Sequence, residues 1–303
     1  MSDSAASEAL VVGAFSRRMR LRVADGGEVN AKIRGRKLKP VCGDRVEAHA
    51  VPNDDDWLVV RVLPRRNELT RPDSRGRVEV LAANLDAVFA VAAPSPAPDW
   101  FVVDRYLAAA AAMGVTGIVV LNKSDRDDAV AAFESARNEY RSAGYDVIEC
   151  SARSATNIES LAAALRDRTA IIVGQSGVGK SSLINALVRD AELRTASVSG
   201  STGEGKHTTV NSVMIELPGG GAVIDSPGVR DYAPALDDAA DVATGFPEIL
   251  ASSADCRFAN CRHLREPDCG VKSALSSGRI SPRRYESYKR LMALSARLAD
   301  RYD

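Results

Sequence analysis

GQSGVGKSS, at residues 174–182, is the stretch that decides the fold class of this chain. It matches the phosphate-loop pattern G-x-x-x-x-G-K-[ST] in full, between a strand-like run, TAIIVG, and a helix-like run, SSLINALV. The glycines let backbone N–H groups surround phosphate oxygens, and the next helix adds its positive N-terminal end. Lys180 is expected to reach the β- and γ-phosphates, and Ser181 to ligate Mg²⁺. The predicted phosphate-binding residues are Gly174, Gln175, Ser176, Gly177, Val178, Gly179, Lys180, Ser181 and Ser182.

A motif for binding guanine, LNKSD at residues 121–125, precedes the phosphate loop. The Asp125 carboxylate can accept hydrogen bonds from N1 and N2 of guanine, whereas adenine would leave it unpaired. Asn122 is expected to hold the phosphate loop, and the backbone after Ser151 to donate to guanine O6. The predicted guanine-binding residues are Asn122, Lys123, Ser124, Asp125, Ser151 and Ala152.

Asp225-Ser-Pro-Gly228 follows an apolar run, GAVI, and resembles the motif that senses the γ-phosphate. Asp225 is predicted to hold Mg²⁺ through water, and the Gly228 N–H to meet the γ-phosphate. Thr208 or Thr209, in the polar stretch SGSTGEGKHTTV, is predicted to add a Mg²⁺ ligand when the γ-phosphate is present. Thr209 is preferred because it lies closer to the next strand.

The group that orients the attacking water is less clearly marked. Val229 follows Gly228, where many GTPases carry a glutamine, and valine can neither donate nor accept a hydrogen bond. Hydrolysis by the protein alone is therefore expected to be slow. His207 is a candidate for orienting water, and an exposed loop histidine or an RNA contact is an equal alternative.

The order of these motifs is reversed relative to an ordinary GTPase, in which the phosphate loop comes first. From residue 85 onward strand-like and helix-like runs alternate, which predicts a doubly wound, mostly parallel α/β sheet. A circular permutation explains both observations, because it moves the chain termini while leaving the sheet and the site unchanged.

The sequence divides into three predicted domains, which makes the chain a multidomain α/β protein. Residues 1–80 hold short strand-like runs typical of an OB-fold β-barrel, followed by a basic linker or mobile arm, PRRNELTRPDSRGR. Residues 81–240 are the predicted circularly permuted P-loop GTPase domain. Residues 241–303 are predicted to be helical and to bind zinc, ending in a basic amphipathic helix.

The zinc prediction rests on three cysteines and a histidine within a short segment. Cys256, Cys261, His263 and Cys269 supply three thiolates and an imidazole, a set that suits tetrahedral structural Zn²⁺ with no open position. The other cysteines, Cys42 and Cys150, are interpreted as core thiols.

Charge is unevenly distributed although the formal net charge is zero. Residues 1–80 and 256–303 carry an excess of Lys and Arg, and the segment between them an excess of Asp and Glu. Basic flanks favour contact with a polyanion such as RNA, and an ordinary solvated surface is the alternative. No apolar run reaches the length of a membrane span and no signal peptide is evident, so a cytoplasmic protein with no membrane partner is expected.

These motifs together resemble the ribosome small subunit-dependent GTPase A family of bacteria. The resemblance rests on the barrel, NKSD before GQSGVGKS, GKHTT, DSPG and the Cys/His cluster, and it covers nearly the whole chain. It implies a GTPase that the small ribosomal subunit stimulates and that acts late in maturation of that subunit. It also implies a barrel and a zinc domain that contact ribosomal RNA.

The predicted function is therefore GTP hydrolysis that controls docking on the small ribosomal subunit, with Mg²⁺ accompanying GTP and one structural Zn²⁺ per chain. The expected partners are that subunit, its rRNA and GTP or GDP, and the chain is expected to be a monomer. A GTP-sensing RNA-binding module with negligible hydrolysis remains an alternative. An enzyme that acts on RNA is disfavoured, because no second cluster of His, Asp or Glu has catalytic spacing.

Overall fold

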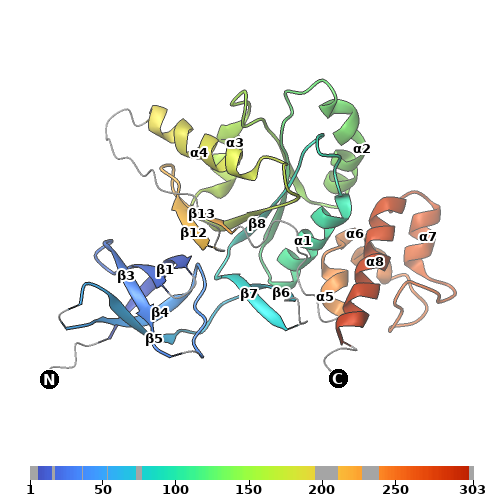
Figure 1. Cartoon of the computed structure of the whole chain (residues 1–303). Coiled ribbons are helices and arrows are strands. Elements are labelled where there is room, and N and C mark those ends of the chain that lie inside the picture. The colour runs from blue at the N-terminus through green and yellow to red at the C-terminus, as the bar shows by residue number, and fades with distance from the viewer. Residues whose placement is uncertain are drawn as a thin grey trace.

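The computed structural model describes residues 6–15, 18–35, 37–52, 54–72, 77–194, 211–226 and 239–299. A β-barrel lies at one end, a sheet with helices on both faces occupies the middle, and a helical C-terminal lobe lies at the other end (Figure 1). The order along the chain follows the predicted one.

The barrel is built from strands β1 to β5, which pair in the order β1-β2-β3-β5-β4, and β1 also pairs with β4 to close it. Alternate side chains point inward, as strand geometry requires, and small or branched apolar residues fill the interior. This is the OB-like barrel that the sequence predicts. Its strands are β1 (Ser7–Phe15), β2 (Arg18–Arg22), β3 (Glu28–Ile33), β4 (Arg45–Ala50) and β5 (Trp57–Val62).

The segment predicted to be a linker or mobile arm, residues 64–77, instead supplies strand β6 of a hairpin. Strands β6 (Glu68–Pro72) and β7 (Val78–Ala83) pair in antiparallel fashion. Leu69 and Ala82 are buried and belong to the main hydrophobic core, which ties the hairpin to the central unit. The basic, weakly apolar composition of the predicted linker concealed the first of these anchors, Leu69.

The middle of the molecule is a doubly wound sheet, as predicted. Its strands run in the order β10-β9-β8-β11-β13-β12, and all pair in parallel except β12, which is antiparallel to β13. The strands are β8 (Ala87–Ala92), β9 (Thr116–Leu121), β10 (Asp146–Glu149), β11 (Thr169–Val173), β12 (Asn211–Glu216) and β13 (Ala222–Asp225).

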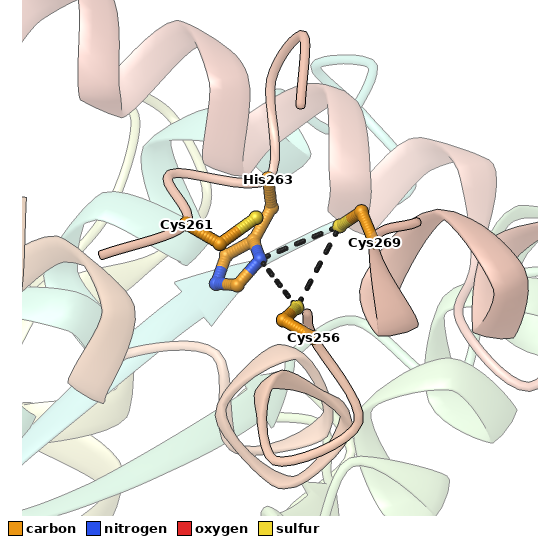
Figure 2. Close-up of side chains that lie close together, drawn as sticks. All are labelled: Cys256, Cys261, His263 and Cys269. Atoms are coloured by element: carbon orange, nitrogen blue, oxygen red, sulfur yellow. Dashed lines mark hydrogen bonds between the residues drawn. The ribbon is translucent and has the colours of Figure 1, made fainter. Parts of the chain in front are cut away.

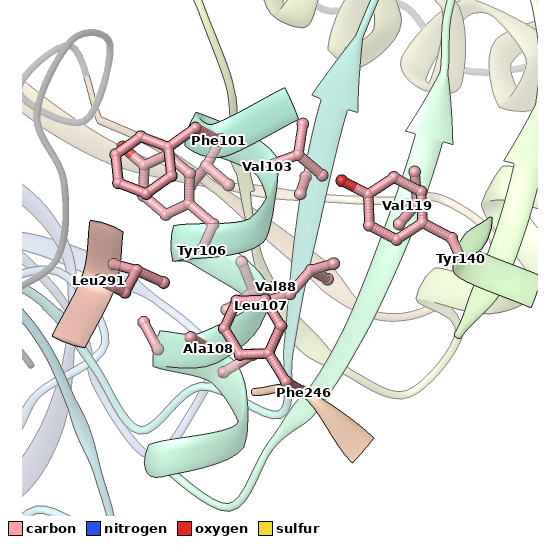
Figure 3. Packing of buried hydrophobic residues seen from close by; sticks show 14 of the residues in the cluster. Val88, Phe101, Val103, Tyr106, Leu107, Ala108, Val119, Tyr140, Phe246 and Leu291 are labelled. Carbon is pink, nitrogen blue, oxygen red and sulfur yellow. The ribbon is translucent and has the colours of Figure 1, made fainter. Parts of the chain in front are cut away.

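Helices cover both faces of this sheet. On one face lie α1 (Trp100–Ala112), which packs on β8 and β9, and α2 (Ala129–Ser142), which contacts β10. Leu107 of α1, Val119 of β9 and Tyr140 of α2 belong to the same hydrophobic cluster (Figure 3). On the other face α3 (Ile158–Leu165) and α4 (Lys180–Arg194) pack on the opposite side chains of the same strands. The buried strand β8 is apolar throughout, as expected for a parallel strand covered on both faces.

The barrel and the central sheet are joined into one 11-stranded sheet, a feature that the sequence did not reveal. Strand β1 pairs antiparallel with β12, with Ala14 opposite Ser212. An ion pair between Arg22 on β2 and Glu216 on β12 adds a second connection. The barrel is therefore attached to the GTPase unit through strand pairing and not only through the chain.

The C-terminal lobe packs on α1, next to α2. Helix α5 contacts α1 and α8, and the buried Arg284 of α8 forms an ion pair with the buried Asp104 of α1. The helices of the lobe are α5 (Ala239–Thr244), α6 (Pro247–Ser253), α7 (Gly270–Ser276) and α8 (Pro282–Ala299). Among the helices that the structure describes, none is long and apolar enough to cross a membrane.

Candidate nucleotide and metal sites

The predicted nucleotide-binding residues gather at one edge of the sheet. Strands β8, β9, β10, β11 and β13 are parallel, so their carboxyl ends lie at the same edge. Asn122 follows β9, Ser151 follows β10, Gly174 follows β11 and Asp225 ends β13. Crevices at this edge are where open α/β sheets bind their ligands.

Two glycines of the phosphate loop have conformations and surroundings that exclude side chains. Gly174 has φ 138° and Gly179 has φ 95°. A Cβ on Gly174 would lie 2.2 Å from the Val91 oxygen, and one on Gly179 would lie 2.4 Å from Asn122 Nδ2. The loop therefore needs glycine at both positions, for close packing on β8 and on the guanine motif.

The loop encloses a small pocket. Lys180 Nζ lies 2.6 Å from the carbonyl oxygens of Gly174 and Gln175, which places its ammonium inside the turn. Gln175 Oε1 accepts a hydrogen bond of 2.8 Å from Asp99 N, so the side chain of Gln175 ties the loop to the start of α1. The pocket of about 280 Å³ is lined by Ser176, Gly177, Gly179, Lys180, Ser181 and Ser182.

The guanine motif is bonded directly to the phosphate loop. Asn122 Nδ2 donates to the Val178 oxygen at 2.8 Å, as the sequence analysis expected of this side chain. Lys123 Nζ donates to the Gly177 oxygen at 2.8 Å, so the aliphatic stem of Lys123 spans the space between the two motifs. Ser124 N donates to the Cys150 oxygen at 3.1 Å, which joins the motif to the end of β10.

Asp125 lies at the mouth of a second pocket and contacts Ser151. The Ser151 hydroxyl donates to Asp125 Oδ1 at 2.6 Å, and this hydrogen bond holds the pKa of the Asp125 carboxyl below its usual range. Of the Ser151–Ala152 pair, predicted to offer a backbone N–H to guanine O6, Ala152 N donates to Asn122 Oδ1 at 3.2 Å. The pocket has a volume of about 260 Å³ and is lined by Asn122, Lys123, Asp125, Arg126, Ala152, Arg153, Gly179 and Ser182.

The structure describes only some of the residues predicted to hold Mg²⁺ or to contact the γ-phosphate. Asp225 is half-buried at the tip of β13, next to the strand that carries the phosphate loop, and Ser181 is exposed at the start of α4. His207, Thr208, Thr209 and Gly228 lie outside the described residues.

The four predicted residues lie together in the C-terminal lobe as a Cys/His cluster that could hold a metal ion (Figure 2). The ligand atoms of Cys256, Cys261, His263 and Cys269 all lie within 4.8 Å of one another. Cys256 Sγ lies 3.8 Å from Cys269 Sγ, and His263 Nδ1 lies 3.4 and 3.5 Å from these two sulfurs. Cys42 and Cys150 are fully buried elsewhere, in agreement with their interpretation as core thiols.

Polar groups that the sequence analysis missed hold the loop around His263. The Tyr285 hydroxyl donates to the His263 oxygen at 2.6 Å, and the Tyr288 hydroxyl to the Arg262 oxygen at 3.1 Å. Glu266 accepts hydrogen bonds from three backbone N–H groups of the loop. The backbone N–H of Glu266 itself, and then these three groups, lower the pKa of its carboxyl to about 2. No spacing rule could have found these partners, because the groups they contact belong to the backbone.

The fold and the site define a class of protein. A doubly wound sheet carries a phosphate loop, an N-K-x-D guanine motif and an aspartate at the carboxyl ends of β11, β9 and β13, and the chain visits them in rotated order. This is the arrangement of a circularly permuted P-loop GTPase.

Comparison with known proteins gives the family. The profile of the family described as RsgA GTPase matches residues 62–234. "Small ribosomal subunit biogenesis GTPase RsgA" of Azotobacter vinelandii is 40% identical over 290 residues, which cover 94% of this chain and 84% of the relative. Its counterpart in Pseudomonas aeruginosa is 40% identical over 285 residues, which cover 93% and 84%. The chain belongs to the RsgA GTPase family and is therefore a GTP-hydrolysing enzyme.

Solved structures show the same architecture. YjeQ from Thermotoga maritima superposes with a TM-score of 0.75 at 28% identity, covering 96% of this chain and 99% of that one. YloQ, described as a circularly permuted GTPase, superposes with a TM-score of 0.71 at 26% identity, covering 96% of each chain. The predicted permutation is thereby confirmed.

Proposed function

We propose that this GTPase acts in biogenesis of the small ribosomal subunit, and that its nucleotide state controls docking on the rRNA of that subunit. The observation that carries the proposal is the 40% identity, over 94% of the chain, to a relative named for small ribosomal subunit biogenesis. A bacterial relative of that name and the basic flanks of this chain both favour an RNA-containing partner.

The proposed chemistry follows from the arrangement at the sheet edge. Backbone N–H groups of the phosphate loop and Lys180 would bind the phosphates, and Asp125 would select guanine. Mg²⁺, when bound, neutralises charge that develops on the transferred phosphoryl group; Ser181, Asp225 and one of Thr208 and Thr209 are the proposed side chains that hold it. Gly228 would contact the γ-phosphate through its backbone.

Stimulation by the subunit is the first prediction. Phosphoryl transfer depends mainly on positioning and charge, so a partner that orders the catalytic segments can raise the rate of a slow enzyme. We expect purified small subunits to accelerate GTP hydrolysis at least tenfold. Replacing His207 with alanine should reduce the stimulated rate more than it reduces GTP affinity. Release of inorganic phosphate, measured with and without subunits, is the readout.

Two outcomes of that measurement would change the proposal. Hydrolysis that stays negligible with subunits present, together with tight GTP binding, would favour the alternative of a GTP-sensing RNA-binding module. A stimulated rate that His207→Ala leaves intact would assign the orientation of water to the subunit or to the backbone near Gly228.

We propose Zn²⁺ as the metal of the Cys/His cluster. With Zn–S bonds of about 2.3 Å and a Zn–N bond of about 2.0–2.1 Å, a tetrahedron has S···S edges of about 3.8 Å and S···N edges of about 3.5 Å. The distances of 3.8, 3.4 and 3.5 Å among Cys256, His263 and Cys269 fit these edges. Four protein ligands leave no open position, so the proposed role is structural.

The second prediction tests this assignment. Protein purified without chelator is expected to contain about one zinc per chain, and Cys261→Ala to lose most of it because one of the four thiolate or imidazole ligands is removed. Cys150→Ala is the matched control, since Cys150 is a buried thiol that lies outside the cluster. Elemental analysis measures the metal. Equal zinc content in the two variants would contradict the proposed ligand set.

The remaining expectations about partners stay proposals. We propose that the protein works as a monomer in the cytoplasm, where ribosomal subunits are assembled. Contacts with rRNA are proposed for the barrel and the C-terminal lobe, both of which display exposed basic residues. Lys37 and Lys39 on the barrel, and Arg262 and Arg265 beside the metal cluster, are exposed.

A further inference from the structure

Two buried serines face each other where β12 and β13 meet the nucleotide-binding edge. Ser212 on β12 is 8% exposed, Ser226 directly after β13 is 6% exposed, and their Oγ atoms are 2.8 Å apart. The antiparallel register, with Val213 opposite Asp225, places the two serines directly across from each other. The two buried hydroxyls therefore satisfy each other with a hydrogen bond across the strand pair.

The two serines border both segments whose conformation depends on nucleotide in the proposed function. Ser226 is the residue after Asp225, the proposed Mg²⁺ ligand, in the D-S-P-G motif. Ser212 comes three positions after Thr209, the threonine preferred as the additional Mg²⁺ ligand. A displacement of Asp225 toward bound metal and γ-phosphate must carry Ser226 with it, because the two are adjacent in the chain.

The opposite edge of β12 belongs to the barrel. Ser212 is paired with Ala14 of β1, and the neighbouring residues continue the same antiparallel ladder. Strand β1 in turn pairs with β2 and β4, so it is part of the wall of the barrel. Ser212 thus contacts the proposed catalytic segment through its side chain and the barrel through its strand.

We propose that Ser212 is a positioning residue that acts through Ser226. Its hydroxyl keeps the Asp225 segment aligned with β12, and it passes displacement of that segment to strand β1 of the barrel. The proposal rests on the proposed function, since it assumes that the Asp225 segment responds to the γ-phosphate. It adds a physical connection between the nucleotide and the domain expected to contact RNA.

Hydrolysis measurements test the alignment. Ser212→Ala and Ser226→Ala should each lower the subunit-stimulated single-turnover rate about three- to tenfold, the effect of one lost hydrogen bond on the transition state. GDP affinity should change less than about twofold, because the phosphate loop and the guanine motif are untouched. Ser212→Thr keeps the hydroxyl on a strand-favouring residue and should restore the rate. Equal rates in all variants, or a GDP affinity that falls together with the rate, would overturn the positioning role.

Amide hydrogen exchange tests the connection to the barrel without requiring ribosomal subunits. Adding a non-hydrolysable GTP analogue with Mg²⁺ should change exchange in Ser7–Phe15 at least about threefold in the unmodified protein, and Ser212→Ala should abolish the change. No change in the unmodified protein, or the same change in the variant, would overturn the connection. Failure of the proposed function is distinguishable, because it would remove stimulation by subunits while leaving the exchange result intact.

Discussion

Replacing Asp125 with asparagine is expected to weaken GTP binding at least a hundredfold and to shift preference toward xanthosine triphosphate. The new amide would present a donor to the N–H groups of guanine, so two charge-assisted hydrogen bonds are lost and a repulsive contact appears. Xanthine carries a carbonyl at C2 that can accept from this amide, which is why its affinity should rise. Equilibrium titration of both nucleotides measures the change in specificity.

A neighbouring residue provides the control for this experiment. Asp127 is exposed two positions away and does not line the pocket that Asp125 borders. Asp127→Asn removes the same charge, so it should leave the affinity for GTP unchanged within about twofold. Similar losses in the two variants would mean that net charge, and not recognition of guanine by Asp125, governs binding.

The nucleotide site could be predicted from the sequence because each of its parts is local. A phosphate loop needs glycines where φ is positive and where backbone or side-chain atoms approach closely, and Gly174 and Gly179 meet both conditions. The metal cluster was predictable for a similar reason, since its four ligands fall within one short segment. Even the reversed order of motifs was informative, because the ends of parallel strands meet at one edge whatever the order of the chain.

Contacts between distant segments could not be predicted in the same way. The pairing of β1 with β12 depends on backbone groups, which every residue carries, so no side-chain pattern announces the register. The β6–β7 hairpin was hidden by its basic composition. The sequence also did not reveal that two arginines of the basic C-terminal helix, Arg283 and Arg284 of α8, form ion pairs within the protein.

These arginines attach the C-terminal lobe to the GTPase unit. Asp104 of α1 accepts hydrogen bonds from Arg284 at 2.7 Å, Arg283 at 2.9 Å and the Tyr140 hydroxyl at 2.7 Å. Burial alone lowers the pKa of Arg284, but the charge of Asp104 and the hydrogen bonds to Glu248 raise it well above its ordinary value. The guanidinium also stacks 4.4 Å from the centroid of the Phe246 ring. Asp104 thus pairs with both arginines, and Glu139 and Glu248 each add a second carboxylate, for Arg283 and Arg284 respectively.

Replacing Asp104 with alanine is therefore expected to lower the free energy of unfolding by about 3 kcal/mol. Asp104 is fully buried and Arg284 is 1% exposed, so the variant leaves a buried guanidinium with only part of its compensation. Unfolding in guanidinium chloride can be followed by the fluorescence of Trp100, whose ring lies 5.7 Å from the Arg283 guanidinium. A Trp57→Phe background makes Trp100 the sole tryptophan, because the chain contains 2.

The same helix supplies a matched control for the loss of an ion pair. Lys289 of α8 pairs with Glu286 at the surface, where both side chains are at least 40% exposed, and Lys289→Ala should change stability by less than about 0.5 kcal/mol. The two variants should differ because water can solvate the exposed Glu286 when Lys289 is lost. Water cannot reach the buried Arg284 guanidinium when Asp104 is lost. If Asp104→Ala cost less than about 1 kcal/mol, Glu248 and the aromatic rings would suffice to hold Arg284. Attachment of the C-terminal lobe to the GTPase unit would then depend on apolar packing between α1, α5 and α8.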